Sequence, residues 1–103
     1  MSISTTTVLE TSARRLFPNQ SLEEVLTELL LERAQKNLLK YQVMARQFAA
    51  KYEQDFGVFR EKVLNSDPDF EVEQDYYDWE MAVTGMEDMK QEIERLRRLH
   101  QEL

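Results

Sequence analysis

Residues 20–56 contain neither glycine nor proline. Within this stretch apolar side chains recur in steps of three or four residues, which is the period of one face of an α-helix and not that of a strand. These positions are Leu22, Leu26, Leu30, Ala34, Leu38, Tyr41, Ala45, Phe48 and Tyr52. A helix over residues 21–53 would be about 50 Å long at ~1.5 Å per residue. A compact globule of 103 residues cannot enclose such a helix, so the sequence predicts a helical hairpin or a coiled coil.

Capping signals set the ends of the first two predicted helices. Ser21 and Glu24 form a capping box, in which the hydroxyl can accept from a backbone amide and the carboxylate can reach back. Asp55 is suited to cap a second, short helix over about residues 56–64. The segment 65–69, with the sequence Asn-Ser-Asp-Pro-Asp, has the composition of a turn.

The last part of the chain has a heptad pattern that predicts a second long helix, over about residues 70–102. Its seam is Trp79, Ala82, Met86, Met89, Ile93, Leu96, His100 and Leu103. Asp67 followed by Pro68 is typical of a helix start, which allows this helix to begin anywhere from residue 68 to 72. Gly85 costs about 1 kcal/mol relative to alanine inside a helix. A kink, a break, or a close neighbouring helix at Gly85 all stay open.

These elements predict an all-α fold of two long antiparallel helices, about 21–53 and 70–102, with the short helix between them. The arrangement is coiled-coil-like. A contact between two helices buries little surface in each chain, so we expect a second copy to complete a dimeric bundle. Residues 19–103 are expected to form a single helical domain.

Residues 1–18 are expected to form a flexible arm or one that a partner orders. Ser2 to Thr7 is prone to form a strand, and Val8 to Leu16 could form a short helix before the capped one. This order resembles a ribbon-helix-helix DNA-binding fold and gives one alternative function, a regulator acting through the N-terminus. Only Arg14 and Arg15 are basic in this region, so phosphate contacts would be few.

Composition excludes several classes of protein. The chain has no cysteine, which removes disulfides, thiolate nucleophiles and cysteine zinc sites. Its two glycines, Gly57 and Gly85, cannot build a phosphate-binding loop. It has no apolar run of about 18 residues and no secretory signal pattern, so we expect a cytoplasmic protein without a membrane span. We also expect that it binds neither a membrane nor a cofactor.

The net charge is −7, and residues 67–103 alone carry −8. The acids gather at the start of the last helix, where the helix dipole favours them. An EF-hand calcium loop is excluded because its sixth position, counted from Asp67, is Val72 and not glycine. We expect these acids to face Lys40, Arg46 and Lys51 across the hairpin or to meet a basic protein partner. The residues expected to bind that partner are Asp75, Asp78, Glu80, Tyr77 and Trp79.

Arg95 and His100 are spaced as Arg-x₄-His near the end of the last predicted helix. This spacing resembles the catalytic motif of HEPN ribonucleases, which are all-α dimers that act on RNA phosphates. Such an enzyme is a second alternative function. Leu96 departs from the motif, because those proteins usually have a polar residue directly after the arginine.

Several short motifs along residues 20–100 carry a family resemblance. They are Lys40-Tyr41, Phe48-Ala49-Ala50-Lys51-Tyr52, Asp55-Phe56 with Phe59, and the acidic stretch Gln74-Asp75-Tyr76-Tyr77-Asp78-Trp79-Glu80. In this order they resemble small prokaryotic antitoxin-like proteins, which are encoded beside a toxin of ribonuclease type. The resemblance implies a non-catalytic protein that binds a basic toxin, and it transfers no catalytic residue. An acidic helix could then mask a basic RNA-binding surface.

Overall fold

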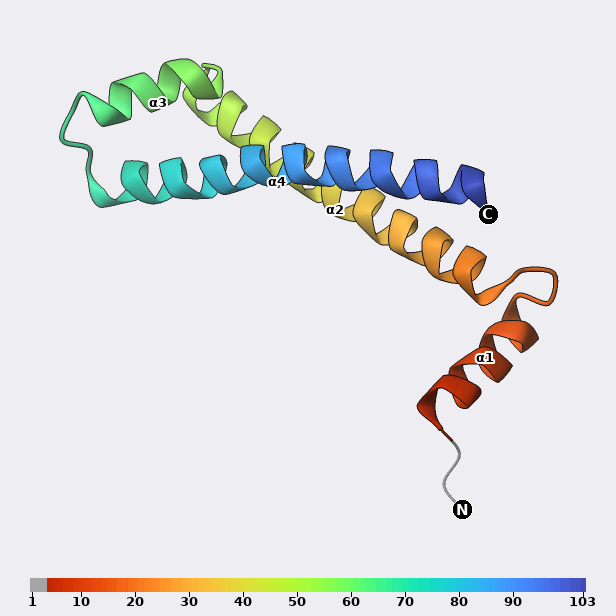
Figure 1. The fold of residues 1–103 in the computed structure, drawn as a ribbon. Coiled ribbons are helices and arrows are strands. Elements are labelled where there is room, and N and C mark those ends of the chain that lie inside the picture. Colours follow the sequence, from red (N-terminus) through yellow and green to blue (C-terminus); the bar gives the residue numbers. More distant parts are fainter. Residues whose placement is uncertain (1–3) are drawn as a thin grey trace.

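The computed structural model describes residues 4–103, which form four helices and no strand. They are α1 (Thr5–Leu16), α2 (Leu22–Tyr52), α3 (Phe56–Leu64) and α4 (Phe70–Glu102). The molecule measures 63 × 34 × 18 Å and has a radius of gyration of 20.2 Å. A compact domain of this length would have a radius of about 13 Å. The extended shape in Figure 1 therefore leaves much of each helix at the surface.

Each helix begins at a side chain that accepts a hydrogen bond from the backbone of its first turn. Ser21 accepts from the Glu24 amide at 3.1 Å, and Asp55 accepts from the Val58 amide at 2.9 Å. The predicted starts of α2 and α3 are confirmed. The cap of α4 is Asp69, which accepts from the Val72 amide at 3.0 Å. The start of α4 at Phe70 lies within the predicted range of residues 68–72, but the cap is Asp69 and not Asp67, which lies three residues before the first helical residue.

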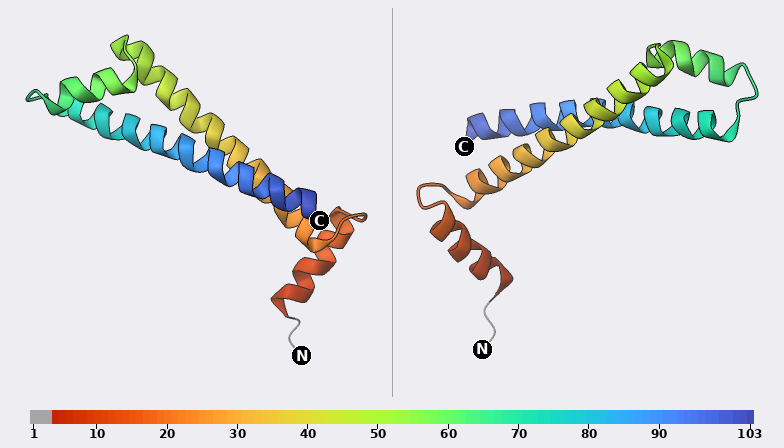
Figure 2. Two further views of the ribbon diagram at one scale, coloured as in Figure 1. Left: turned by 45° about the horizontal axis from the view of Figure 1, so that its top comes forward. Right: turned by 180° about the vertical axis from the view of Figure 1, so that it is seen from behind.

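The two long helices run antiparallel and cross near their middles (Figures 1 and 2). Gly85 marks a close approach between them. A Cβ atom at this position would lie 2.7 Å from the Tyr41 ring. Of the three explanations for this glycine, close approach of a neighbouring helix is the one observed, and α4 continues unbroken through it.

Replacing Gly85 with alanine is expected to lower the free energy of unfolding by up to about 2 kcal/mol. Overpacking against the Tyr41 ring, which costs about 1–3 kcal/mol, outweighs the gain of roughly 1 kcal/mol in helix propensity. Gly57→Ala is the matched control, because its Cβ would meet only Asp55 Oδ1 at 3.4 Å. Urea denaturation should show no loss for the control. Equal effects of the two substitutions would contradict the packing explanation.

On one side of the crossing, α3 fills the space where α2 and α4 diverge (Figure 2). The core here is aromatic. Its buried members are Phe59, Val63, Tyr76 and Trp79, and Phe48, Tyr52, Phe56 and Val72 pack against them. The other side of the crossing has a smaller core of Ala34, Ile93 and Leu96. In the predicted seam of α4 the buried members are Trp79, Ala82, Ile93 and Leu96, while Met86 and Met89 are half-buried and His100 and Leu103 are exposed. In the α2 pattern, Leu26 and Leu30 are exposed.

Helix α1 occupies most of the predicted N-terminal arm. The chain is helical from Thr5, so the strand expected over Ser2–Thr7 is wrong at Thr5–Thr7, while Met1–Ile3 lie outside the described residues. The Ser4 hydroxyl accepts from the Thr7 amide at 3.1 Å and starts the helix. This local hydrogen bond favours helix over the strand that β-branched threonines would otherwise prefer. α1 projects from the hairpin beyond the turn at residues 17–21 (Figure 1).

Candidate functional site

The five predicted partner-binding residues all lie in the first half of α4, but they differ in exposure. Trp79 is 2% exposed and belongs to the aromatic core. Tyr77 is 55% exposed and faces outward, where its ring edge meets Tyr76. The three acids, Asp75, Asp78 and Glu80, are all intermediate in exposure. Only Tyr77 among the five combines a large side chain with wide access to solvent.

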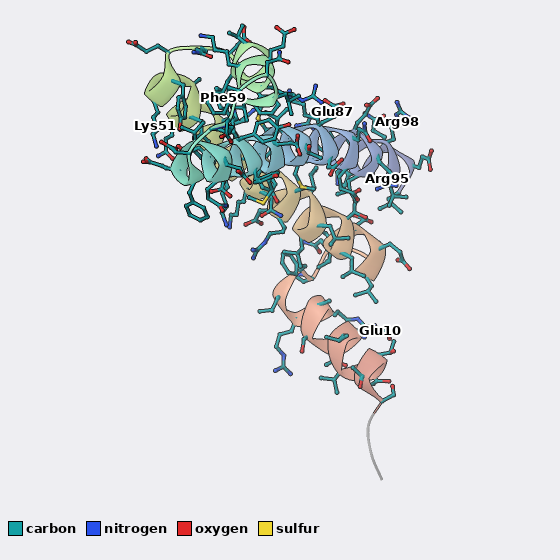
Figure 3. The ribbon with its side chains drawn as sticks, turned by 90° about the vertical axis from the view of Figure 1, so that its left-hand side faces the viewer. Glu10, Lys51, Phe59, Glu87, Arg95 and Arg98 are labelled. Carbon is teal, nitrogen blue, oxygen red and sulfur yellow. The ribbon has the colours of Figure 1, made fainter. Side chains whose placement is uncertain are left out.

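Asp75 holds the start of α4 against the end of α2. Its Oδ2 accepts from Lys51 Nζ at 2.6 Å and from Tyr52 Oη at 2.5 Å. Lys51 also donates to Glu71 at 2.9 Å. Figure 3 places Lys51 at the same end of the hairpin as Phe59, away from Arg95 and Arg98. The predicted pairing of Asp75 with Lys51 is therefore confirmed.

These contacts shift the pKa values of the groups involved. Burial would raise the pKa of Asp75, but hydrogen bonds from Lys51 and Tyr52 outweigh burial and hold the pKa below its ordinary value. Burial and the hydrogen bond to Asp75 raise the pKa of Tyr52 from 10.0 to about 12. Hydrogen bonds to Asp75 and Glu71 raise the pKa of Lys51. The folded state thus favours ionised Asp75 and protonated Tyr52.

The stability of the protein is expected to fall at both pH extremes. The contribution of Asp75 is lost as the pH falls through its lowered pKa, because the unfolded state then binds the proton more readily. The contribution of Tyr52 is fully present below pH 10 and is lost as the pH rises towards 12. Tyr52→Phe should remove about 1 kcal/mol at pH 7 and flatten the decline between pH 10 and 12. Denaturation series at several pH values would test this, and an unchanged alkaline slope would contradict it.

The other predicted pairs across the hairpin are wrong. Asp78 accepts from Gln74 on its own helix at 3.1 Å. Glu80 accepts from Tyr76 Oη at 2.8 Å, and Arg60 of α3 donates to that same hydroxyl at 3.3 Å. Within residues 4–103, neither Lys40 nor Arg46 forms an ion pair. The spacing of charges along each helix could not show that α3, and not α2, would approach Glu80.

An exposed ridge runs along α4 on the side away from the seam. We call it the outer ridge, and its members are Phe70, Glu73, Tyr77, Met81, Thr84 and Asp88. They follow steps of three or four residues, so they share one helix face. Phe70 is 83% exposed, and Met81 is 53% exposed. The outer ridge therefore combines large apolar side chains with carboxylates, and Asp78 flanks it.

Phe70 and Met81 were not among the candidate site residues predicted from the sequence. A signal for them was present, because Phe70, Tyr77 and Met81 repeat with helical spacing on the face opposite the seam. Aromatic residues and methionine are also enriched in protein interfaces, whereas they seldom gather on an exposed face without a partner. When one apolar stripe of a helix is buried in the core, a second stripe on the opposite face thus indicates a surface that binds a partner.

The two residues of the alternative ribonuclease motif contact different acidic side chains. Arg95 pairs with Glu92 in the preceding turn, whereas His100 Nε2 lies 3.4 Å from Glu28 Oε1 of α2. Among the described residues there is no cluster of His, Asp or Glu able to hold a metal ion. No helix in residues 4–103 is both long and apolar enough to cross a membrane.

Comparisons of the chain with protein-family models, with curated proteins and with solved structures find no match.

Proposed function

We propose that this protein is a non-catalytic interaction module of the cytoplasm, similar to an antitoxin, that binds and masks a basic protein through the outer ridge of α4. The observation that carries the proposal is the combination of exposed Phe70, Tyr77 and Met81 with carboxylates on one helix face. We also propose that the module is a coiled-coil-like homodimer.

Charge supports a basic partner. Residues 67–103 carry a net charge of −8, and Glu73, Asp78 and Asp88 lie on or beside the outer ridge without a basic partner in the described residues. Carboxylates on an interface speed association with a basic surface and reject acidic ones. The apolar side chains between them would supply the buried centre of the interface, where aromatic residues contribute most of the binding energy.

The core residues have a positioning role in this scheme. Trp79 and Asp75 fix the first half of α4 against α2 and α3, which keeps the outer ridge straight and outward-facing. A rigid helix face loses little conformational entropy when it binds. Two of the residues expected to contact a partner would thus support binding from within the fold.

Co-expression with the product of the adjacent gene is the direct test. We expect a complex that purifies intact at low salt and whose affinity falls as the salt concentration rises, because exposed charges are screened within about 8–10 Å. A basic partner whose affinity is independent of salt would contradict the role of the carboxylates.

A further inference from the structure

A second exposed face lies on the N-terminal half of α2, between the sides covered by α1 and α4. Its members are Glu23, Leu26, Leu30 and Arg33, spaced by three, four and three residues. Leu26 is 50% exposed and Leu30 is 56% exposed. Neither Glu23 nor Arg33 forms an ion pair within residues 4–103. The face is thus an apolar centre with one unpaired charge of each sign at its ends.

Two antiparallel copies of this face are complementary to each other. When α2 of a second copy lies antiparallel with Leu30 opposite Leu26, its Arg33 comes opposite Glu23. A two-fold axis repeats both contacts, so four leucines lie between two ion pairs about 15 Å apart along the helix. Antiparallel helices also place their dipoles favourably. The spacing of the leucines and of the two charges favours a second copy over an unrelated partner, because a second copy satisfies both kinds of contact in one register.

The hollow beside this face supports the same occupant. A space of about 400 Å³ between α1 and α2 is lined mainly by apolar side chains, and Leu26 belongs to both surfaces. Leu9 and Leu16 of α1 line it and are themselves more than half exposed. The second copy would extend over these side chains as it covers Leu26.

The exposed area of the chain agrees with a missing partner. A compact monomer of this mass, 12.3 kDa, exposes about 6,100 Å². The isolated chain exposes 7,980 Å². The excess is larger than the roughly 800 Å² that each partner buries in a typical stable interface.

We infer that the chain forms a two-fold homodimer through antiparallel pairing of α2, with Leu26 against Leu30 and Glu23 against Arg33 of the other copy. This interface leaves the outer ridge of α4 free. The inference rests on the proposed homodimer and specifies its interface, but it does not depend on the identity of the basic partner.

Charge exchange in the full-length protein tests both the dimer and its register. Glu23→Arg and Arg33→Glu should each weaken dimerisation at least about 10-fold in sedimentation equilibrium, because each puts like charges together at both ends of the interface. The double exchange should restore the dimer. Mixing the two single variants should give a heterodimer in which every pair is again opposite in charge.

Two results would overturn the inference. One is a wild-type chain that stays monomeric over the whole concentration series. The other is a dimer that the single exchanges weaken but that neither the double exchange nor mixing restores. Leu26→Asp combined with Leu30→Asp should give a folded monomer, since both side chains are exposed in the single chain, and circular dichroism would report its helicity. A dimer that persists in this variant would also contradict the interface.

Discussion

Trp79→Ala is expected to lower the free energy of unfolding by about 3–5 kcal/mol, the range for removing a large buried aromatic side chain. The indole is enclosed by rings from α2 and α3. Its ring centre lies 5.9 Å from that of Phe48, 5.3 Å from that of Phe56 and 5.1 Å from that of Phe59. Removing it leaves a cavity where the three helices meet. A folded domain typically has a total stability of about 5–15 kcal/mol, so this single substitution would remove a large share of it.

Tyr77→Ala is the matched control for this prediction. Tyr77 lies two residues before Trp79 on the same helix but faces solvent. Its replacement should change stability by only about 0.5 kcal/mol. Urea denaturation followed by circular dichroism measures both variants. Comparable losses for Tyr77 and Trp79 would show that the aromatic core does not have the packing described.

Charge reversal on the outer ridge is expected to weaken binding of the basic partner about 100-fold, or roughly 3 kcal/mol. The variant replaces Glu73, Asp78 and Asp88 with lysine. These acids are chosen because none of them holds α2 or α3, whereas Asp75 and Glu80 bind the hydroxyls of Tyr52 and Tyr76. Reversal of Asp75 or Glu80 would therefore mix a loss of stability with a loss of binding.

The control for this experiment replaces Glu53, Glu61 and Glu102 with lysine. These exposed acids lie outside the outer ridge, so both variants change the net charge by the same amount. Isothermal titration at physiological salt should show a small change for the control and a large one for the outer ridge. If the two variants lose the same amount of affinity relative to the wild type, the net charge and not the outer ridge determines the affinity.

Much of the fold could be predicted because its signals are local. Ser21 and Asp55 begin their helices through hydrogen bonds to residues three positions along, and such bonds depend on nothing distant. The seam of α4 was also readable, because Trp79, Ala82, Ile93 and Leu96 repeat at one period and are buried together.

What could not be predicted depends on how the helices rotate and cross. Heptad spacing gives the face of each helix but not its partner, so Leu26 and Leu30 continue the α2 pattern beyond the part that α4 covers. The predicted charge partners of Asp78 and Glu80 were wrong for the same reason. Helix α3 packs between α2 and α4 and brings Arg60 near Tyr76. The sequence pattern of α4 alone does not show which residue of α3 will approach it.

The antiparallel pairing of α2 and α4 has a consequence for the order of folding. Contacts beside α3 join residues close in sequence, such as Tyr52 and Asp75, 23 positions apart. Contacts at the open end join Glu28 to His100, 72 positions apart. Closing a longer loop costs more entropy, so the contacts between α2 and α4 should form first at the α3 end and then progressively towards the open end. The N-terminal half of α2 would then be the last part of the hairpin to gain its neighbour and the first to lose it.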